Sequence, residues 1–366
     1  MKSKWTYRPL GELVSFASGG TPSKKRDGYW GGTIPWISAK TLKTENIDTS
    51  DLFITEEGLK AGSKIAPKGS ILLLTRGSGL FNGIPIARVE KDVAFNQDIK
   101  CLDTYGEVEN EFIFYWLLSQ KDYLMAKVGV TGIGAGKFDL DFLQKLMIPI
   151  PSERERKSIV GFANSISEKI RCNAKVNDNL YAQVKAIFSE NFLDLDFLPD
   201  GWKTGNLLDI ADYLNGLAMQ KYRPKDGETG LPVLKIKELR QGICDASSEL
   251  CSPSIKSEYI IHDGDIIFSW SGSLLVDIWC GGTCGLNQHL FKVTSNNYDK
   301  WFYYLWTAHH LDRFIAVAAD KATTMGHIKR EELEKVEVII PSKCDYKRIG
   351  ALIKPLFDLI ISNRIE

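Results

Sequence analysis

The sequence predicts an α+β protein in which two similar mixed α/β domains are separated by long helices that pair as an antiparallel coiled coil. Two observations lead to this prediction. Segments of the first half recur in the same order in the second half. Between the halves, residues 152–191 lack proline and carry apolar side chains at helical spacing. A long core helix inside one large domain would explain the spacing, but it would not explain the repeat.

The repeat consists of five pairs of matched segments. They are LGELVSF (10–16) with LLDIADY (207–213), IPWISAKTL (34–42) with LPVLKIKEL (231–239), APKGSILLLTRGS (66–78) with IHDGDIIFSWSGS (261–273), AFNQDIKCL (94–102) with GLNQHLFKV (285–293), and KFDLDFLQKLMIPIP (137–151) with HIKREELEKVEVIIP (327–341). The offset drifts only from 197 to 190, as small loop deletions would produce. An ordered series of this kind indicates an internal duplication.

Each half is therefore expected to form the same mixed unit. In the first half, an amphipathic segment at 10–16 and a Gly-Gly-Thr-Pro turn come before the strands. The strand-like runs, bounded by Gly, Pro, Asn or Asp, are Ile34–Ser38, Ile71–Thr75, Ile84–Val89 and Ile99–Leu102. A helix at 109–126, a glycine-rich loop at 129–136, a short helix from Asp139 and a strand at 146–150 complete the unit. The second half repeats this order from about Trp202 to Ile340.

The apolar stripe between the halves has a second copy at the C-terminus. Ile159, Phe162, Ile166 and Ile170 correspond, at an offset of 190, to Ile349, Leu352, Leu356 and Ile360, and the first stripe continues through Leu180, Val184 and Ile187. About 40 helical residues form a rod of roughly 60 Å, which is long for a helix inside a globular core. Asn173 and Asn363 also correspond, and a polar Asn in each seam would fix the register of an antiparallel coiled coil.

These patterns divide the chain into four segments. We expect a first domain at 1–151, a central spacer helix at 152–197, a second domain at 198–341 and a short distal helix at 342–366. The two domains would be related by an approximate twofold axis.

Composition narrows the function classes. Lys plus Arg and Asp plus Glu each total 46, so the formal net charge is zero, which argues against simple non-specific DNA binding but allows a local basic surface. Seven cysteines without a CxxC pair are typical of reduced structural thiols, and the spacing of Cys280 and Cys284 with His262 or His289 matches no usual zinc site. The sequence shows no signal peptide and no membrane span, so we expect a cytoplasmic protein. Because of the cysteine and histidine spacing, we expect no metal site.

At this point the chain resembles the specificity subunits of type I restriction–modification systems (HsdS family). The resemblance covers the whole length and rests on the alternation of globular units and long helices. It also rests on the local sequences SGGTPS, IPWISAKTL, PKGSILLLTRGS, FNQDIKCL and IPIPSERERKSIV. It implies two target recognition domains, each of which reads one half of a bipartite, asymmetric site in double-stranded DNA.

The resemblance also implies partners. The helices would dock two methyltransferase (modification) subunits, and restriction subunits with ATP-driven translocation would join them. No cofactor is expected in this chain, whereas S-adenosylmethionine, ATP and Mg are expected in the partner subunits. The helix positions expected to form the coiled coil or contact partners are Ile159, Phe162, Ile166, Ile170, Leu180, Val184, Ile349, Leu352, Leu356 and Ile360.

Candidate DNA contacts in the first half are basic or polar residues at loops and strand ends, because phosphate contacts position a protein and base contacts specify the sequence. They are Lys24, Lys25, Arg26, Tyr29, Ser38, Lys40, Arg76 and Lys137. A solvated charge run is the alternative for Lys24–Arg26, and Trp36 is interpreted as a core residue. Arg76 follows an apolar strand, and Arg is the most frequent reader of guanine edges.

The second half offers a different set at matched positions. The candidates are Gln220, Lys221, Tyr222, Arg223, Lys235, Lys237, Ser271 and His327, where Trp270 and Ser271 replace Arg76, and His327 replaces Lys137. These differences predict two different half-sites. The shared pair Asn96-Gln97 and Asn287-Gln288 is interpreted first as framework hydrogen bonding and second as base reading.

The sequence gives no recognisable catalytic constellation. GIGAGK (132–137) fails as a phosphate loop because Thr131 stands where the first glycine should be and Phe138 replaces the Ser/Thr. No NPPY-like segment and no local nucleophile–histidine pair is present. We therefore expect a non-catalytic DNA-recognition subunit. The alternatives are a truncated or phase-variable adaptor, suggested by the short distal helix, and a divergent DNA methyltransferase.

Overall fold

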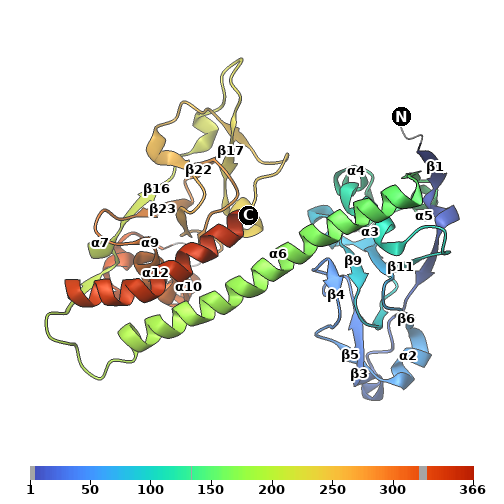
Figure 1. The fold of residues 1–366 in the computed structure, drawn as a ribbon, viewed down its shortest axis with the longest axis horizontal. Coiled ribbons are helices and arrows are strands. Elements are labelled where there is room, and N and C mark those ends of the chain that lie inside the picture. The colour runs from blue at the N-terminus through green and yellow to red at the C-terminus, as the bar shows by residue number, and fades with distance from the viewer. Residues whose placement is uncertain (1–4, 133, 321–327) are drawn as a thin grey trace. The chain divides into compact units, whose positions relative to one another are not determined.

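The structure is a computed structural model that describes residues 5–132, 134–320 and 328–366. The chain forms two compact units, Met1–Glu168 (unit 1) and Lys169–Glu366 (unit 2), each with its own hydrophobic core. The long helix α6 (Glu153–Phe188) begins in unit 1 and ends in unit 2 (Figure 1). Within the described ranges, no helix combines the length and the apolar character that crossing a bilayer requires.

The described residues of unit 1 form four small sheets. Their strand orders are β1-β14, β5-β3-β10-β6, β2-β11-β7-β9-β4 and β12-β13-β8. The strands are β1 (Thr6–Pro9), β2 (Val14–Ser18), β3 (Trp30–Ile37), β4 (Asn46–Ile47), β5 (Phe53–Ile54), β6 (Lys64–Ala66), β7 (Ile71–Leu74), β8 (Arg76–Gly77), β9 (Ile86–Val89), β10 (Val93–Phe95), β11 (Ile99–Thr104), β12 (Gly129–Val130), β13 (Gly136–Lys137) and β14 (Met147–Ile150). The helices before α6 are α1 (Leu10–Leu13), α2 (Glu56–Gly62), α3 (Asn110–Ser119), α4 (Lys121–Met125) and α5 (Leu140–Gln144).

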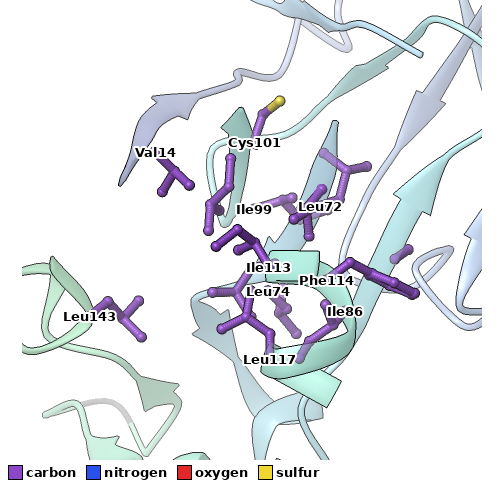
Figure 2. Close-up of a cluster of buried hydrophobic side chains, with 14 of the residues drawn as sticks. Val14, Leu72, Leu74, Ile86, Ile99, Cys101, Ile113, Phe114, Leu117 and Leu143 are labelled. Atoms are coloured by element: carbon purple, nitrogen blue, oxygen red, sulfur yellow. The ribbon is translucent and has the colours of Figure 1, made fainter. Parts of the chain in front are cut away.

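The core of unit 1 centres on β7 and α3. All residues of β7, Ile71–Leu74, are fully buried, which explains why this strand is an uninterrupted apolar run rather than an alternating one. Figure 2 shows Leu72 and Leu74 among the buried side chains of Ile86, Ile99, Ile113 and Leu117. Burial of each such side chain stabilises the fold by about 1.5–3 kcal/mol. The apolar runs of the sequence thus form the centre of the unit.

Unit 2 repeats the topology of unit 1. Its sheets have the orders β15-β24, β16-β23-β20-β21 and β18-β17-β22-β19, which match β1-β14, β2-β11-β7-β9 and β5-β3-β10-β6. The strands are β15 (Lys203–Asn206), β16 (Asp212–Asn215), β17 (Leu231–Leu234), β18 (Leu250–Cys251), β19 (Ile260–Ile261), β20 (Ile266–Ser269), β21 (Leu275–Ile278), β22 (Cys284–Leu286), β23 (Leu290–Thr294) and β24 (Glu337–Ile340). Parallel pairing also recurs, since β3 pairs with β10 and β17 pairs with β22 in parallel. The duplication expected from the sequence is therefore a duplication of fold.

The helix expected at 109–126 is interrupted. It forms α3 and α4, with a break at Gln120, whose backbone angles are φ −99° and ψ 6°. The amide of Gln120 donates to Leu117 O at 3.1 Å, so the last turn of α3 tightens before α4 begins. The same break occurs in unit 2 between α9 (Lys300–His309) and α10 (Leu311–Asp320), at His310, with φ −87° and ψ 1°. The remaining helices of unit 2 are α7 (Leu207–Ile210), α8 (Ile236–Gln241), α11 (Glu331–Glu334) and α12 (Lys343–Ile365).

The two long helices begin with equivalent caps. At α6, Ser152 Oγ accepts from the amide of Glu155 at 3.4 Å, and Glu155 Oε2 accepts from the amide of Ser152 at 3.0 Å. At α12, Ser342 Oγ accepts from the amide of Asp345 at 3.2 Å. Such caps satisfy amides that have no partner within the helix. The serine after each closing Ile-Pro therefore marks where each sheet ends and each long helix starts.

In unit 2, α12 runs antiparallel to the C-terminal part of α6, as Figure 1 shows. Lys169 forms an ion pair with Glu366 at 2.7 Å, while Asn173 Nδ2 donates to Asn363 O at 3.3 Å. Asn363 Nδ2 in turn donates to Asn177 Oδ1 at 2.9 Å, and Asn177 Nδ2 donates to Ile360 O at 3.3 Å. Residues later in α6 contact residues earlier in α12, as expected for antiparallel helices. The expected asparagine pair is present, and Asn177 joins it.

The buried face of α12 differs in part from the stripe expected from the sequence. Ile349, Ile353, Phe357 and Ile360 are buried, whereas Leu352 is 51% exposed and Leu356 is half-buried. On α6, Leu180 and Val184 are buried as expected. The difference arises because α12 also packs against α9, where the rings of Phe357 and Tyr304 are 5.2 Å apart. The contact between α6 and α12 is part of the core of unit 2. Because α9 also packs against α12, a different set of α12 side chains is buried.

A core truncation tests this packing. We expect Ile360→Ala to lower the stability of the α12 region by about 2–5 kcal/mol, because the side chain is fully buried. Hydrogen–deuterium exchange of the α12 amides measures this change. The matched variant Ile166→Ala, at a residue that is 45% exposed, should shift exchange by less than about 0.5 kcal/mol. Equal effects of the two variants would contradict the packing described.

Candidate nucleic-acid interface

The first loop of unit 1 lies between β2 and β3 and presents its basic residues to solvent. Lys24 and Lys25 are exposed, and neither forms an ion pair within the described ranges. Arg26 Nη1 donates to Tyr29 Oη at 2.8 Å, and the guanidinium lies 5.5 Å from the centre of the Tyr29 ring. Tyr29 is half-buried in the short 3-10 turn Asp27–Tyr29. The loop therefore carries positive charge that no ion pair compensates. Within it, the Tyr29 ring restrains the side chain of Arg26.

The turn after β3 contains Ser38 and Lys40. Ser38 is half-buried, and its amide donates to Thr41 Oγ1 at 2.8 Å, so it closes the turn. Lys40 is exposed at the tip of the same turn. Trp36 is buried, as interpreted from the sequence, and its Nε1 donates to Gly20 O at 3.0 Å. Of this region, Lys40 is the side chain available to a ligand.

Arg76 and Lys137 are brought together across a small antiparallel ribbon. They are direct partners in the pairing of β8 with β13, so both side chains project from the same face. The close approach depends on Gly136, because a Cβ there would lie 2.9 Å from Leu80 Cβ and 3.1 Å from Gly77 O. The amide of Phe138 continues the ribbon by donating to Thr75 O at 2.9 Å.

A cavity of about 290 Å³ lies beside this ribbon, and we refer to it as the basic pocket. It is lined by Thr75, Arg76, Gln97, Lys100, Lys137, Phe138, Asp139, Leu140 and Leu143. Three cations and one carboxylate give the lining a net positive charge. Asp139 Oδ1 accepts from the amide of Asp141 at 3.1 Å, so that carboxylate caps α5.

The pocket includes Lys100, which the sequence did not single out for binding, and Gln97, for which base reading was the second interpretation. Lys100, on β11, is half-buried and donates to Ser18 Oγ. Gln97 is exposed, and its Oε1 accepts from Thr21 Oγ1 at 2.7 Å. Asn96 is buried, and its side chain contacts Asp98, as a framework role requires. Asn96 directly follows β10 and Gln97 lies in the turn before β11, so the fold places these two neighbours in different surroundings.

The first loop of unit 2 has a different charge arrangement. Gln220 and Lys221 lie in the 3-10 turn Met219–Lys221, and both are exposed, as is Tyr222. Arg223 forms an ion pair with Glu249 at 3.0 Å. Here, therefore, a cation of the loop already has a carboxylate partner.

The two lysines after β17 also have acidic partners. Lys235 pairs with Glu249 at 2.5 Å, and its hydrogen bond lowers the pKa of the Glu249 carboxyl group below the usual value. Lys237 lies 3.7 Å from Asp245 and donates to Ser247 Oγ at 2.9 Å. A DNA phosphate would have to compete with these carboxylates for both lysines.

The positions that match the ribbon of unit 1 hold other chemistry in unit 2. Trp270 Nε1 donates to Asn215 Oδ1 at 2.9 Å, and its ring lies 5.7 Å from that of Phe291. Ser271 is buried, at 6% exposure. His327 lies outside the described residues. In unit 2, a buried serine thus stands at the position of Arg76, and an aromatic residue stands at the position of Thr75.

The N-terminal part of α6 carries a row of exposed apolar side chains. The exposures are 37% for Ile159, 70% for Phe162, 45% for Ile166 and 66% for Ile170. In unit 1, this part of α6 is attached through its other face, where Tyr115 Oη donates to Asn164 Oδ1 at 2.7 Å and Arg156 Nε to Glu109 Oε2 at 2.9 Å. The structure thus does not pack these four residues in a seam as it packs Leu180 and Val184.

Among the residues that the structure describes, no group of three or more His, Cys, Asp or Glu side chains is arranged to hold an ion. All seven cysteines are free thiols.

Comparison with known proteins agrees with the duplicated architecture. The family model of the type I restriction modification DNA specificity domain matches residues 2–182 and again residues 199–366. The chain is 26% identical over 391 residues to the specificity subunit of the type I restriction enzyme MjaIX from Methanocaldococcus jannaschii, and this match covers 98% of the chain and 88% of that protein.

Two further relatives extend the comparison. A 184-residue match, 29% identical, links 48% of the chain to 46% of the EcoR124I/EcoR124II specificity subunit of Escherichia coli. The fold is similar to the crystal structure of a type I restriction–modification S subunit from M. genitalium, with a TM-score of 0.57 at 15% identity, covering 99% of this chain and 91% of that one. Two copies of the domain in one chain, joined by a long helix, make this chain a member of the type I restriction–modification specificity family, the non-catalytic subunits through which such systems recognise DNA.

Proposed function

We propose that each unit contacts one half of a bipartite target in double-stranded DNA, and that the two half-sites differ in sequence. The observation that carries this proposal is the difference at matched positions of one duplicated fold. The loop after β2 carries Lys24, Lys25 and Arg26 in unit 1, whereas the matching loop after β16 carries Gln220, Lys221 and Tyr222 in unit 2. A shared framework with different side chains at equivalent places gives two readers of unlike base pairs.

In unit 1, we assign backbone contacts to Lys24, Lys25, Arg26 and Lys40. Their side chains lie in loops, and within the described ranges none of them forms an ion pair. Phosphate contacts of this kind release counterions and supply affinity that does not depend on sequence. Tyr29 restrains Arg26 in this proposal, and Ser38 shapes the turn that carries Lys40.

In unit 2, we assign DNA contacts to Gln220, Lys221 and Tyr222, which are exposed in the first loop. Arg223, Lys235 and Lys237 stand beside them with acidic partners already in place. Carboxylates next to cations disfavour non-specific adhesion, so unit 2 would depend more on base contacts than unit 1 does. His327, which lies outside the described residues, completes the positions assigned to this half, whereas Ser271 is buried and is not assigned a contact.

The partners that we propose are two methyltransferase (modification) subunits, joined by restriction subunits, in the cytoplasm. The exposed side chains Ile159, Phe162 and Ile166 on α6 give a partner an apolar surface to cover. The S-adenosylmethionine, ATP and Mg used by the complex would be bound by those partners. The chain itself would supply recognition and attachment.

The proposed reading of two half-sites is tested by methylation mapping. We expect cells that co-express this chain with its modification subunit to methylate a motif with two unlike specific halves and a fixed non-specific gap. Long-read sequencing of the genome detects the modified bases. The modification subunit expressed alone is the control and should leave no such motif. A single uninterrupted motif, or two identical halves, would contradict the proposal.

The proposed docking surface is tested by one exposed residue. We expect Phe162→Glu to weaken co-purification of the modification subunit at least about tenfold, because a charge would be buried at an apolar contact. Affinity capture followed by quantitative gel analysis measures this loss. The control is Phe197→Glu, at a side chain that is 77% exposed and lies outside α6, and it should leave the complex intact. Equal behaviour of the two variants would exclude this face of α6 as the contact.

A further inference from the structure

We propose that the basic pocket of unit 1 binds a phosphate group of the DNA backbone, with Arg76, Lys100 and Lys137 as its ligands. This assignment rests on the proposed DNA recognition and deepens it. It adds Lys100 and Gln97 to the interface, and it makes Arg76 a positioning contact rather than a reader of a guanine edge.

The cations converge on one cavity. The three cations come from three different strands, β8, β11 and β13, and border one cavity of about 290 Å³. Gln97 and Thr75 line the same cavity. The hydroxyl of Thr75 is already used, because it donates to Asp98 O at 3.0 Å, so the cations and the Gln97 amide remain as donors for a ligand.

Two like charges stand directly opposite each other on the ribbon. Arg76 and Lys137 are cross-strand partners, an arrangement that destabilises a ribbon unless an anion lies between the charges. Within the described ranges, no carboxylate lies within ion-pairing distance of Arg76, Lys100 or Lys137. The one acidic residue of the lining, Asp139, caps α5. The pocket therefore keeps an uncompensated positive charge that suits an anionic ligand.

The shape of the pocket also suits a phosphate. Base edges lie on the floor of a groove and are read by side chains that protrude into it. The cations here instead surround a concavity, which suits a compact group with several acceptor oxygens. A phosphate that projects from the DNA backbone has this geometry, and contacts to phosphates fix the orientation of the protein on the duplex.

Unit 2 lacks the corresponding cations among its described residues. Ser271 occupies the place of Arg76, and Phe291 occupies that of Lys100. Asn215, which matches Ser18, binds Trp270 there rather than a lysine. The phosphate contact is thus assigned to unit 1 alone, and the two units would be oriented on DNA by different contacts.

The test uses the full chain purified with its modification subunits. Fluorescence anisotropy is measured from 50 to 300 mM KCl with two labelled duplexes, one carrying the mapped motif and one with that motif scrambled. The variants are Arg76→Gln, Lys100→Gln, Lys137→Gln and Arg76→Lys. The matched control is Lys68→Gln, an exposed lysine at the opposite end of β7 from Arg76. Methylation mapping of each variant is the second readout.

Each pocket Gln variant should lower affinity for both duplexes by the same factor, roughly five- to tenfold at 0.1 M salt, and reduce the salt slope by about one. The methylated motif should stay unchanged, and Arg76→Lys should retain most of the slope. A loss confined to the motif duplex, with a relaxed base in one half-site, would overturn the assignment in favour of a guanine edge. If the affinity of the wild-type complex depends steeply on salt and the Gln variants do not change that dependence, the assignment of the pocket would be wrong while the proposed function would stand. A wild-type complex with neither motif nor salt-dependent binding would overturn the proposed function and the pocket together.

Discussion

The double-sided burial of one short strand in each unit is the constraint on which the rest of the structure depends. Every residue of β7 and of β20 is buried, and each strand has a hydrogen-bonded neighbour on both sides. A strand held in this way cannot shift without exposing apolar surface or breaking a ladder. The residues that follow it, Arg76 in unit 1 and Ser271 in unit 2, therefore leave the sheet from a fixed point. Recognition chemistry can vary at that point while the framework stays the same.

Much of this framework could be predicted from the sequence, because it is written in local patterns. The matched blocks supply strands to three sheets whose order recurs in both units apart from the edge strand β4, and the uninterrupted run at 71–74 is a doubly buried strand. The break at Gln120 could not be predicted, since apolar periodicity continues across it. The buried stripe of α12 also escaped prediction in part, because a two-helix pattern takes no account of α9 as a second neighbour. Local sequence patterns identify helices and strands. A third packing partner, here α9, determines which face of α12 is buried.

The candidate site shows the same division. Arg76 and Lys137 were recognisable as strand-end cations, but 60 residues of sequence separate them, and only the pairing of β8 with β13 makes them neighbours. Lys100 lies within a strand that reads as core, and its exposure to the pocket depends on how β11 pairs with β2 and β7. In unit 2, the pairing of Lys235 with Glu249 bridges two separate segments. Charge compensation is a tertiary property, so a count of lysines could not distinguish the two units.

The tight contact at Gly136 has a consequence for how such a protein can diversify. Any larger residue there would approach Leu80 Cβ and Gly77 O too closely, so the ribbon or the turn Ser78–Asn82 would have to shift. The two side chains at the ribbon's surface, in contrast, are not packed into the core. Substitutions at 76 or 137 could thus change the side chains that face a ligand without destabilising the fold. A substitution of Gly136, in contrast, would disturb the packing of the ribbon. Position 137, whose side chain can change, and position 136, which must be glycine, are thus neighbours in the same two-residue strand.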